Sequence, residues 1–187
     1  MENIDFSDIL KKDEEVIATT RACSKTIAVR AMLPFLCIGI FITLMFIPLL
    51  CTVLGHDPIE WCMLLMPGLF FILAIVFGVL ASKAGKNYAV CLTQKRVIIK
   101  HGIFTKNYRT FLIERVTGNI VSSCTQSILN RKDTAVSLNV RIELYPVGHN
   151  NVTIYTQPIF DGRDFLNKIE EVVKKNSEEL KIEQIKD

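Results

Sequence analysis

The sequence lacks the short motifs that identify several large classes of enzyme. It contains no GxGxxG or GxxxxGK(S/T) pattern for a nucleotide, no HExxH for a catalytic zinc ion and no GxSxG around a nucleophilic serine. Each motif holds particular groups at the spacing that its chemistry requires, so their absence argues against these functions. The sequence therefore predicts a non-catalytic protein without a cofactor. The alternative is an enzyme whose catalytic residues converge only in space.

Metal-ligand spacing is also missing. The six cysteines form no CxxC pair, and His56, His101 and His149 have no partner ligand at a useful spacing. Isolated histidines in loops and at strand ends are usually incidental. We expect neither a metal site nor a disulfide framework.

Charge is absent from two long stretches. Residues 31–54 and 61–82 contain no Asp, Glu, Lys, Arg or His, and only residues 55–60 separate them. A helix needs about 20 apolar residues to cross a bilayer. Both stretches are long enough, and the short link makes them antiparallel. They predict a transmembrane α-helical hairpin rather than a buried helical pair of a soluble protein, because they are apolar on every side.

Lys and Arg are absent from the link but frequent on the other flanks of the two stretches. Arg21, Lys25 and Arg30 precede the first, and Lys83 and Lys86 follow the second. The positive-inside rule then predicts a multi-pass protein of the cell membrane with both termini in the cytoplasm. Because neither span contains a charged residue, transport by this chain alone is not expected.

Small residues recur along the second span at Ala74, Gly78 and Ser82. A spacing of four places them on one helix face, where another backbone can approach closely. The first predicted helix, which has Gly39 and Thr43 at the same spacing, is one candidate partner. A second copy of the chain is the other.

After the second span the pattern changes to short β-strands. Residues 136–144 alternate apolar and polar side chains, which is typical of a strand with one buried face. Gly118 indicates a bulge or bend, and Asp161 is a candidate N-cap for an amphipathic helix. The expected strands are residues 88–92, 96–101, 108–113, 115–123, 136–144 and 152–156.

The predicted organisation has four parts: a cytoplasmic lead-in (1–30), the hairpin (31–82), a cytoplasmic domain (83–175) and a charged tail (176–187) that either continues the helix or frays. Within the lead-in, residues 16–20 could form a short strand that docks on the domain. The fold class is a membrane α-helical hairpin plus a mainly-β domain.

Three segments of the domain resemble the bacterial pleckstrin-homology (PH) domain family. Residues 88–102 are similar to its Y-x-L-T-x-x-R opening, residues 111–120 to its next strand, and residues 126–131 to its Q-S-x-hydrophobic-x-R turn. The chain departs from the family pattern at Glu114, where proline is common, and after Arg131, where glycine is common. The resemblance implies an antiparallel barrel or sandwich capped by a C-terminal α-helix, and two membrane helices before the domain.

The family's eukaryotic relatives in fold bind phosphoinositides or peptides, which makes both kinds of ligand candidates by analogy. We expect a membrane-anchored interaction module that binds a protein partner or a second copy of itself. The first alternative is recognition of anionic lipid head groups, because residues 83–160 contain 11 Lys or Arg but only 3 Asp or Glu. The second is an accessory subunit of an export or resistance transporter. Nucleic-acid binding is not expected. The candidate head-group contacts are Lys83, Lys86, Arg96, Lys100, Arg131 and Lys132.

Overall fold

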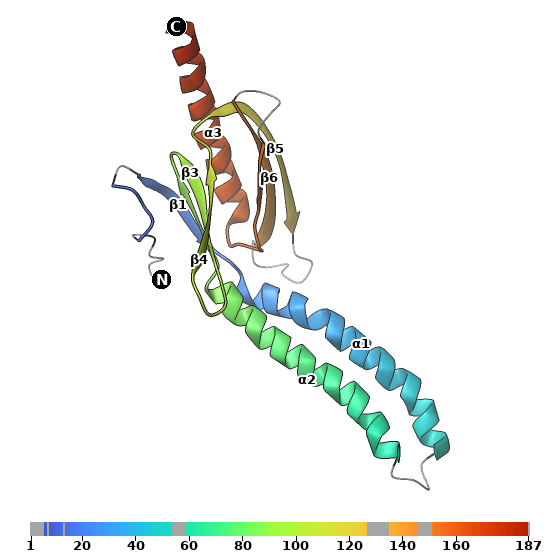
Figure 1. Ribbon diagram of the computed structural model, residues 1–187. Helices are drawn as coiled ribbons and strands as arrows, with labels where there is room; N and C mark the ends of the chain where they lie inside the picture. The colour runs from blue at the N-terminus through green and yellow to red at the C-terminus, as the bar shows by residue number, and fades with distance from the viewer. Residues whose placement is uncertain are drawn as a thin grey trace.

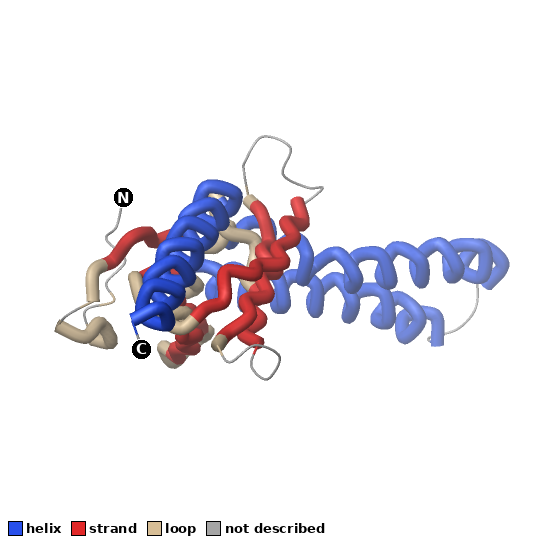
Figure 2. Tube along the Cα trace, turned by 90° about the horizontal axis from the view of Figure 1, so that it is seen from above, coloured by secondary structure: helices blue, strands red, loops and turns tan. Residues whose placement is uncertain are grey.

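The computed structural model describes residues 6, 8–12, 14–53, 59–126, 135–145 and 151–186. Two long helices form an arm that projects from a mainly-β domain, and a third helix lies along the sheets (Figures 1 and 2). In chain order the elements are β1 (Val16–Arg21), α1 (Ser24–Val53), α2 (Ile59–Lys86), β2 (Ala89–Thr93), β3 (Arg96–His101), β4 (Asn107–Leu112), β5 (Val116–Gln126), β6 (Val136–Leu144), β7 (Asn151–Tyr155) and α3 (Gly162–Lys186).

The arm consists of α1 and α2, which lie side by side and antiparallel (Figure 1). Both helices extend beyond the predicted spans on the side of the domain, α1 beginning at Ser24 and α2 ending at Lys86. Residues 24–30 contain no proline or glycine that would end the helix. By length and composition, Ser24–Phe46 and Pro67–Lys86 could each cross a membrane, and few of their residues are buried within the protein.

The domain contains two antiparallel sheets. The first has the order β1-β2-β3-β4 and the second the order β5-β6-β7. The expected strands 96–101 and 136–144 have the observed bounds, and the other predicted strand ends differ by a few residues. A register shift between Val116 and Ile120 confirms the irregularity expected around Gly118.

The strand expected within residues 16–20 forms as β1 and docks on the domain. It pairs with β2 along its length, with Thr19 opposite Cys91, and Ala18 and Ala22 lie in the core. The N–H of Phe160 donates to the carbonyl of Arg21 at 2.9 Å. The arm is therefore an insertion between two neighbouring strands of one sheet. Of the two alternatives for the tail, continuation of the helix is observed, since α3 extends to Lys186.

Helix α3 lies along the sheets, as Figure 2 shows from above. It begins directly after Asp161, whose carbonyl accepts the N–H of Phe165 at 3.0 Å. Near its middle, Asn176 Nδ2 donates to the carbonyl of Ile113 at 2.8 Å. The amphipathic pattern correctly predicted which residues of α3 face the core. They are Phe165, Leu166, Ile169, Val172 and Val173.

A short N-terminal segment covers the outer face of the four-stranded sheet. We call residue 6, residues 8–12 and Glu14 the N-terminal strap. Phe6 is buried against Cys91 and Ile98 in a small second core. Arg96 of β3 fixes the strap, since its guanidinium donates to Glu14 Oε2 at 2.6 Å and to the carbonyl of Ile9 at 2.8 Å. The strap therefore covers the central part of this outer face, over β2 and β3.

Candidate functional site

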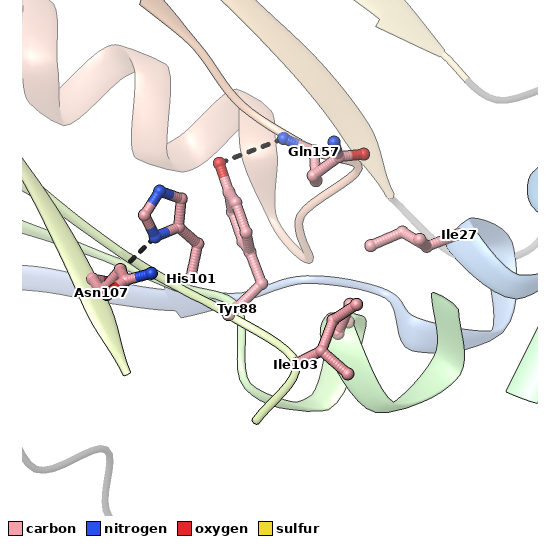
Figure 3. A pocket seen from close by; sticks show the side chains of 9 residues that line it. Ile27, Tyr88, His101, Ile103, Asn107 and Gln157 are labelled. Atoms are coloured by element: carbon pink, nitrogen blue, oxygen red, sulfur yellow. Dashed lines mark hydrogen bonds between the residues drawn. The ribbon is translucent and has the colours of Figure 1, made fainter. Parts of the chain in front are cut away.

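A groove runs along the domain from the base of the arm. It consists of two adjoining cavities of ≈ 270 and ≈ 390 Å³, both lined by Tyr88, His101 and Gln157. The smaller cavity reaches Ile27 of α1 and the end of α2, and Figure 3 shows it from close by. The larger cavity is lined by residues of β4 and β7 and of β3, which pairs with β4. We call the two together the β4–β7 groove.

Tyr88 stands at the centre of the β4–β7 groove because it joins α2 to β2. Its N–H donates to the carbonyl of Gly85 at 3.2 Å, and its hydroxyl oxygen accepts the N–H of Gln157 at 3.2 Å (Figure 3). Burial raises the pKa of the Tyr88 hydroxyl, although the Gln157 N–H and the charge of Arg109 act in the opposite direction. The hydroxyl is therefore neutral at physiological pH.

Gly85 allows the two helices to meet at this point. A Cβ at Gly85 would lie 2.7 Å from Cα of Ser24, which is backbone and cannot move aside. The close approach brings Ile27 and Tyr88 to the same cavity. The base of the arm and the floor of the groove are thus one packed unit.

His101 ends β3 on the other side of Tyr88. Its Nδ1 lies 3.0 Å from the carbonyl oxygen of Asn107, which can only accept, so Nδ1 carries the proton. Among the described residues Nε2 has no hydrogen-bond partner, and in Figure 3 it points away from Asn107. In the neutral ring this nitrogen is a hydrogen-bond acceptor.

The walls of the larger cavity are two sheet edges. β4 is the last strand of the first sheet and β7 the last strand of the second. From them Arg109, Phe111, Thr153 and Tyr155 line the cavity. Such a surface offers main-chain hydrogen-bonding groups, aromatic area and one guanidinium. This chemistry suits an extended peptide with an apolar and an acidic side chain.

The four predicted head-group contacts that the structure describes lie in two separate places. Lys83 and Lys86 are exposed at the end of α2, at the base of the arm. Arg96 and Lys100 lie under the N-terminal strap instead: Arg96 is paired with Glu14, and Lys100 Nζ lies 5.8 Å from the ring centroid of Phe6. The two remaining candidates, Arg131 and Lys132, lie outside the described residues.

The predicted packing face of α2 is directed at α1. Ala74 is fully buried, and a Cβ added to Gly78 would overlap the side chain of Met32. Ser82, one turn further on, is half-buried. Of the two partners considered for this face, the first helix is the one in contact.

Sequence reasoning missed the β4–β7 groove. His101 was interpreted as incidental, and Tyr88, Arg109 and Gln157 were not singled out. Tyr88 and Gln157 are 69 residues apart, so no local spacing could have paired them. In the described part of the chain, no group of three or more His, Cys, Asp or Glu side chains could hold a metal ion.

The chain was compared with protein families, curated proteins and solved structures. No curated protein and no solved structure matches the chain. The family model described as the bacterial PH domain matches residues 28–155, from the first turns of α1 through β7. The match thus includes both helices of the arm and six strands of the domain. The chain belongs to the bacterial PH domain family.

Proposed function

We propose that this protein is a membrane-anchored, non-catalytic interaction module of the cytoplasmic membrane surface. The arm spans the cell membrane twice, both termini lie in the cytoplasm, and the β4–β7 groove binds an extended segment of another protein chain. That chain is a different protein or a second copy of this one.

The membrane part of the proposal is supported by what the arm exposes. Leu44 and Leu65 are 60% and 70% exposed, and their neighbours on the outer faces are also large and apolar. Lys25, Arg30, Lys83 and Lys86 all lie near the end of the arm that joins the domain. This asymmetry of charge favours a cytoplasmic domain.

The observation that carries the proposed binding of a peptide is that β4 and β7, each the last strand of its sheet, both line the groove. An edge strand presents unpaired main-chain groups to which an extended peptide can add. Natural proteins commonly protect such edges. The first sheet protects its other edge, since β1 contacts α3 and Ala22, the residue after β1, bridges to Ile159. The edges of β4 and β7 instead border a cavity of ≈ 390 Å³.

Photo-cross-linking in intact membranes tests the binding part. A photoreactive amino acid replaces Tyr155 in the groove and, as a matched control, Ile182 on the exposed side of α3. We expect a discrete protein adduct from position 155 that disappears when Arg109→Ala is added, and none from position 182. Adducts of one size from both positions, or only lipid adducts from position 155, would contradict the proposal.

Anionic head groups are the second candidate, favoured by the exposed Lys83, Lys86 and Lys106 near the base of the arm. A fragment beginning at residue 86 would lack β1, so the test requires the full chain. Native mass spectrometry from mild detergent should show anionic lipids retained on the wild type and reduced by Lys83→Gln with Lys86→Gln. Equal retention of neutral lipids would eliminate this candidate.

A further inference from the structure

The turn between β3 and β4, residues 102–106, reaches the base of the arm (Figure 1). At its tip are two apolar residues, Ile103 and Phe104. Phe104 is 81% exposed, the highest value for a large hydrophobic residue in the described part of the chain. The domain leaves this aromatic side chain and part of Ile103 uncovered.

This turn has a fixed shape. Gly102 has φ 138°, and a Cβ there would overlap the carbonyl oxygen of Thr105, so only glycine fits. Asn87, the residue after α2, donates from Nδ2 to the carbonyls of Gly102 and Ile103, both at 3.2 Å. The tip is therefore tied directly to the end of the second arm helix.

Two lysines at the end of α2 lie close to the tip. Lys83 and Lys86 lie in its last turn, and Lys83 Nζ is 5.6 Å from the ring centroid of Phe104. Lysines at the end of an apolar helix reach toward the head-group region, where aromatic residues are also enriched. Phe104 thus lies at the depth at which α2 would leave the hydrocarbon.

We propose that the Ile103–Phe104 tip inserts into the boundary between head groups and acyl chains of the bilayer that holds the arm. The inference rests on the proposed function, since it requires the arm to span that bilayer. It adds a third point of attachment to the two helices. Because Ile103 also lines the smaller cavity of the β4–β7 groove, insertion fixes how the groove is presented at the membrane surface.

Tryptophan fluorescence of the full chain in vesicles tests this placement. Trp61 is the one tryptophan of the sequence, so Trp61→Phe with Phe104→Trp puts a single reporter at the tip. The matched control is Trp61→Phe with Tyr145→Trp. Tyr145 is exposed and directly follows β6. The other end of β6, at Val136, is the one near the arm, because Val136 hydrogen-bonds to Ile159 and Ile159 bridges to Ala22. The vesicles contain phosphatidylcholine brominated near the top of its acyl chains.

The tip reporter should be quenched by brominated lipid several-fold more strongly than the Tyr145→Trp reporter, with emission shifted to shorter wavelength. The unaltered chain reports on the arm through Trp61. If Trp61 is quenched and the tip reporter is not, the insertion is wrong while the membrane anchor stands. If neither is quenched, the anchor fails and the insertion with it. A tip reporter shielded from both brominated lipid and aqueous acrylamide would mean that protein covers it, which also overturns the assignment.

Discussion

The arm and the domain bury opposite kinds of side chain. In the domain the largest aliphatic residues are inside, and Leu92 and Ile142 are fully buried. In the arm the smallest residues are inside, at Ala74 and Gly78, and the large ones such as Leu44 face outward. Burial of large apolar side chains is what water favours, whereas close contact through small residues is typical of helices that pack in lipid. This contrast is what the proposed membrane anchor requires of the arm.

The largest difference in stability should appear when leucine is replaced by alanine once in the domain and once in the arm. Leu92→Ala leaves a cavity in a fully buried site and should lower the free energy of unfolding by about 2–5 kcal/mol. Leu44→Ala removes a side chain that faces away from the protein and should change it by less than about 0.5 kcal/mol. Both changes in the free energy of unfolding can be measured by urea unfolding of the full chain in mild detergent. Tyrosine fluorescence in a Trp61→Phe background monitors the unfolding. A large loss at Leu44 would mean that the arm is packed against protein.

A second substitution adds a side chain at the contact between the two arm helices. Gly78→Leu forces a side chain into Met32 of α1 and should cost about 1–3 kcal/mol, seen as a lower melting temperature of the helical signal in mild detergent. The matched control is Gly68→Leu on the same helix, since a Cβ at Gly68 meets nothing within 4 Å. Equal melting of the two variants would show that the Gly78 face does not hold the helices together.

The sequence predicted most where one physical pattern dominates a segment. Uninterrupted apolar runs identified both arm helices, strict alternation identified β6 from Val136 to Leu144, and the stripe from Phe165 to Val173 identified the core face of α3. In each case the side chains of a single element contain the whole signal. The antiparallel sheets and the C-terminal helix were therefore predictable at the level of fold class.

The sequence predicted that residues 16–20 could dock on the domain as a strand, but not with which strand they would pair. Thr19 pairs with Cys91 although 72 residues separate them, and the intervening arm hides the pairing from any local pattern. Arg96 was predicted to contact lipid because it belongs to the basic stretch of residues 83–160. The sequence could not indicate that Arg96 would instead pair with Glu14. The β4–β7 groove was missed for the same reason, since it forms only when the edges of two sheets meet.

The N-terminal strap provides a smaller test, on the covered face of the domain. Arg96→Gln leaves the carboxylate of Glu14, which is 4% exposed, without its charged donor, at a cost of about 1–3 kcal/mol. The strap should then detach and uncover Cys91, whose pKa burial raises to about 11. We expect several-fold faster alkylation of Cys91, read by peptide mass spectrometry. Lys95→Gln is the control, because Lys95 and Glu114 are exposed and 3.7 Å apart, and it should leave the rate unchanged.

The smallest effect should be the pH dependence of the same strap. Burial acts to raise the pKa of Glu14, but the bonds from Arg96 and from the Lys11 N–H outweigh it and hold the pKa below its ordinary value of 4.5. A lowered folded-state pKa means that ionised Glu14 stabilises docking fully above about pH 4.5 and loses this contribution as pH falls through the lowered value. Hydrogen exchange of residues 8–12, corrected for intrinsic rates, should therefore show protection that declines only on the acid side. Glu14→Gln should reduce protection at neutral pH and remove the decline, whereas Glu114→Gln should do neither. A decline that persists in Glu14→Gln would assign the titration to another group and leave the apolar contacts of Phe6 as what holds the strap.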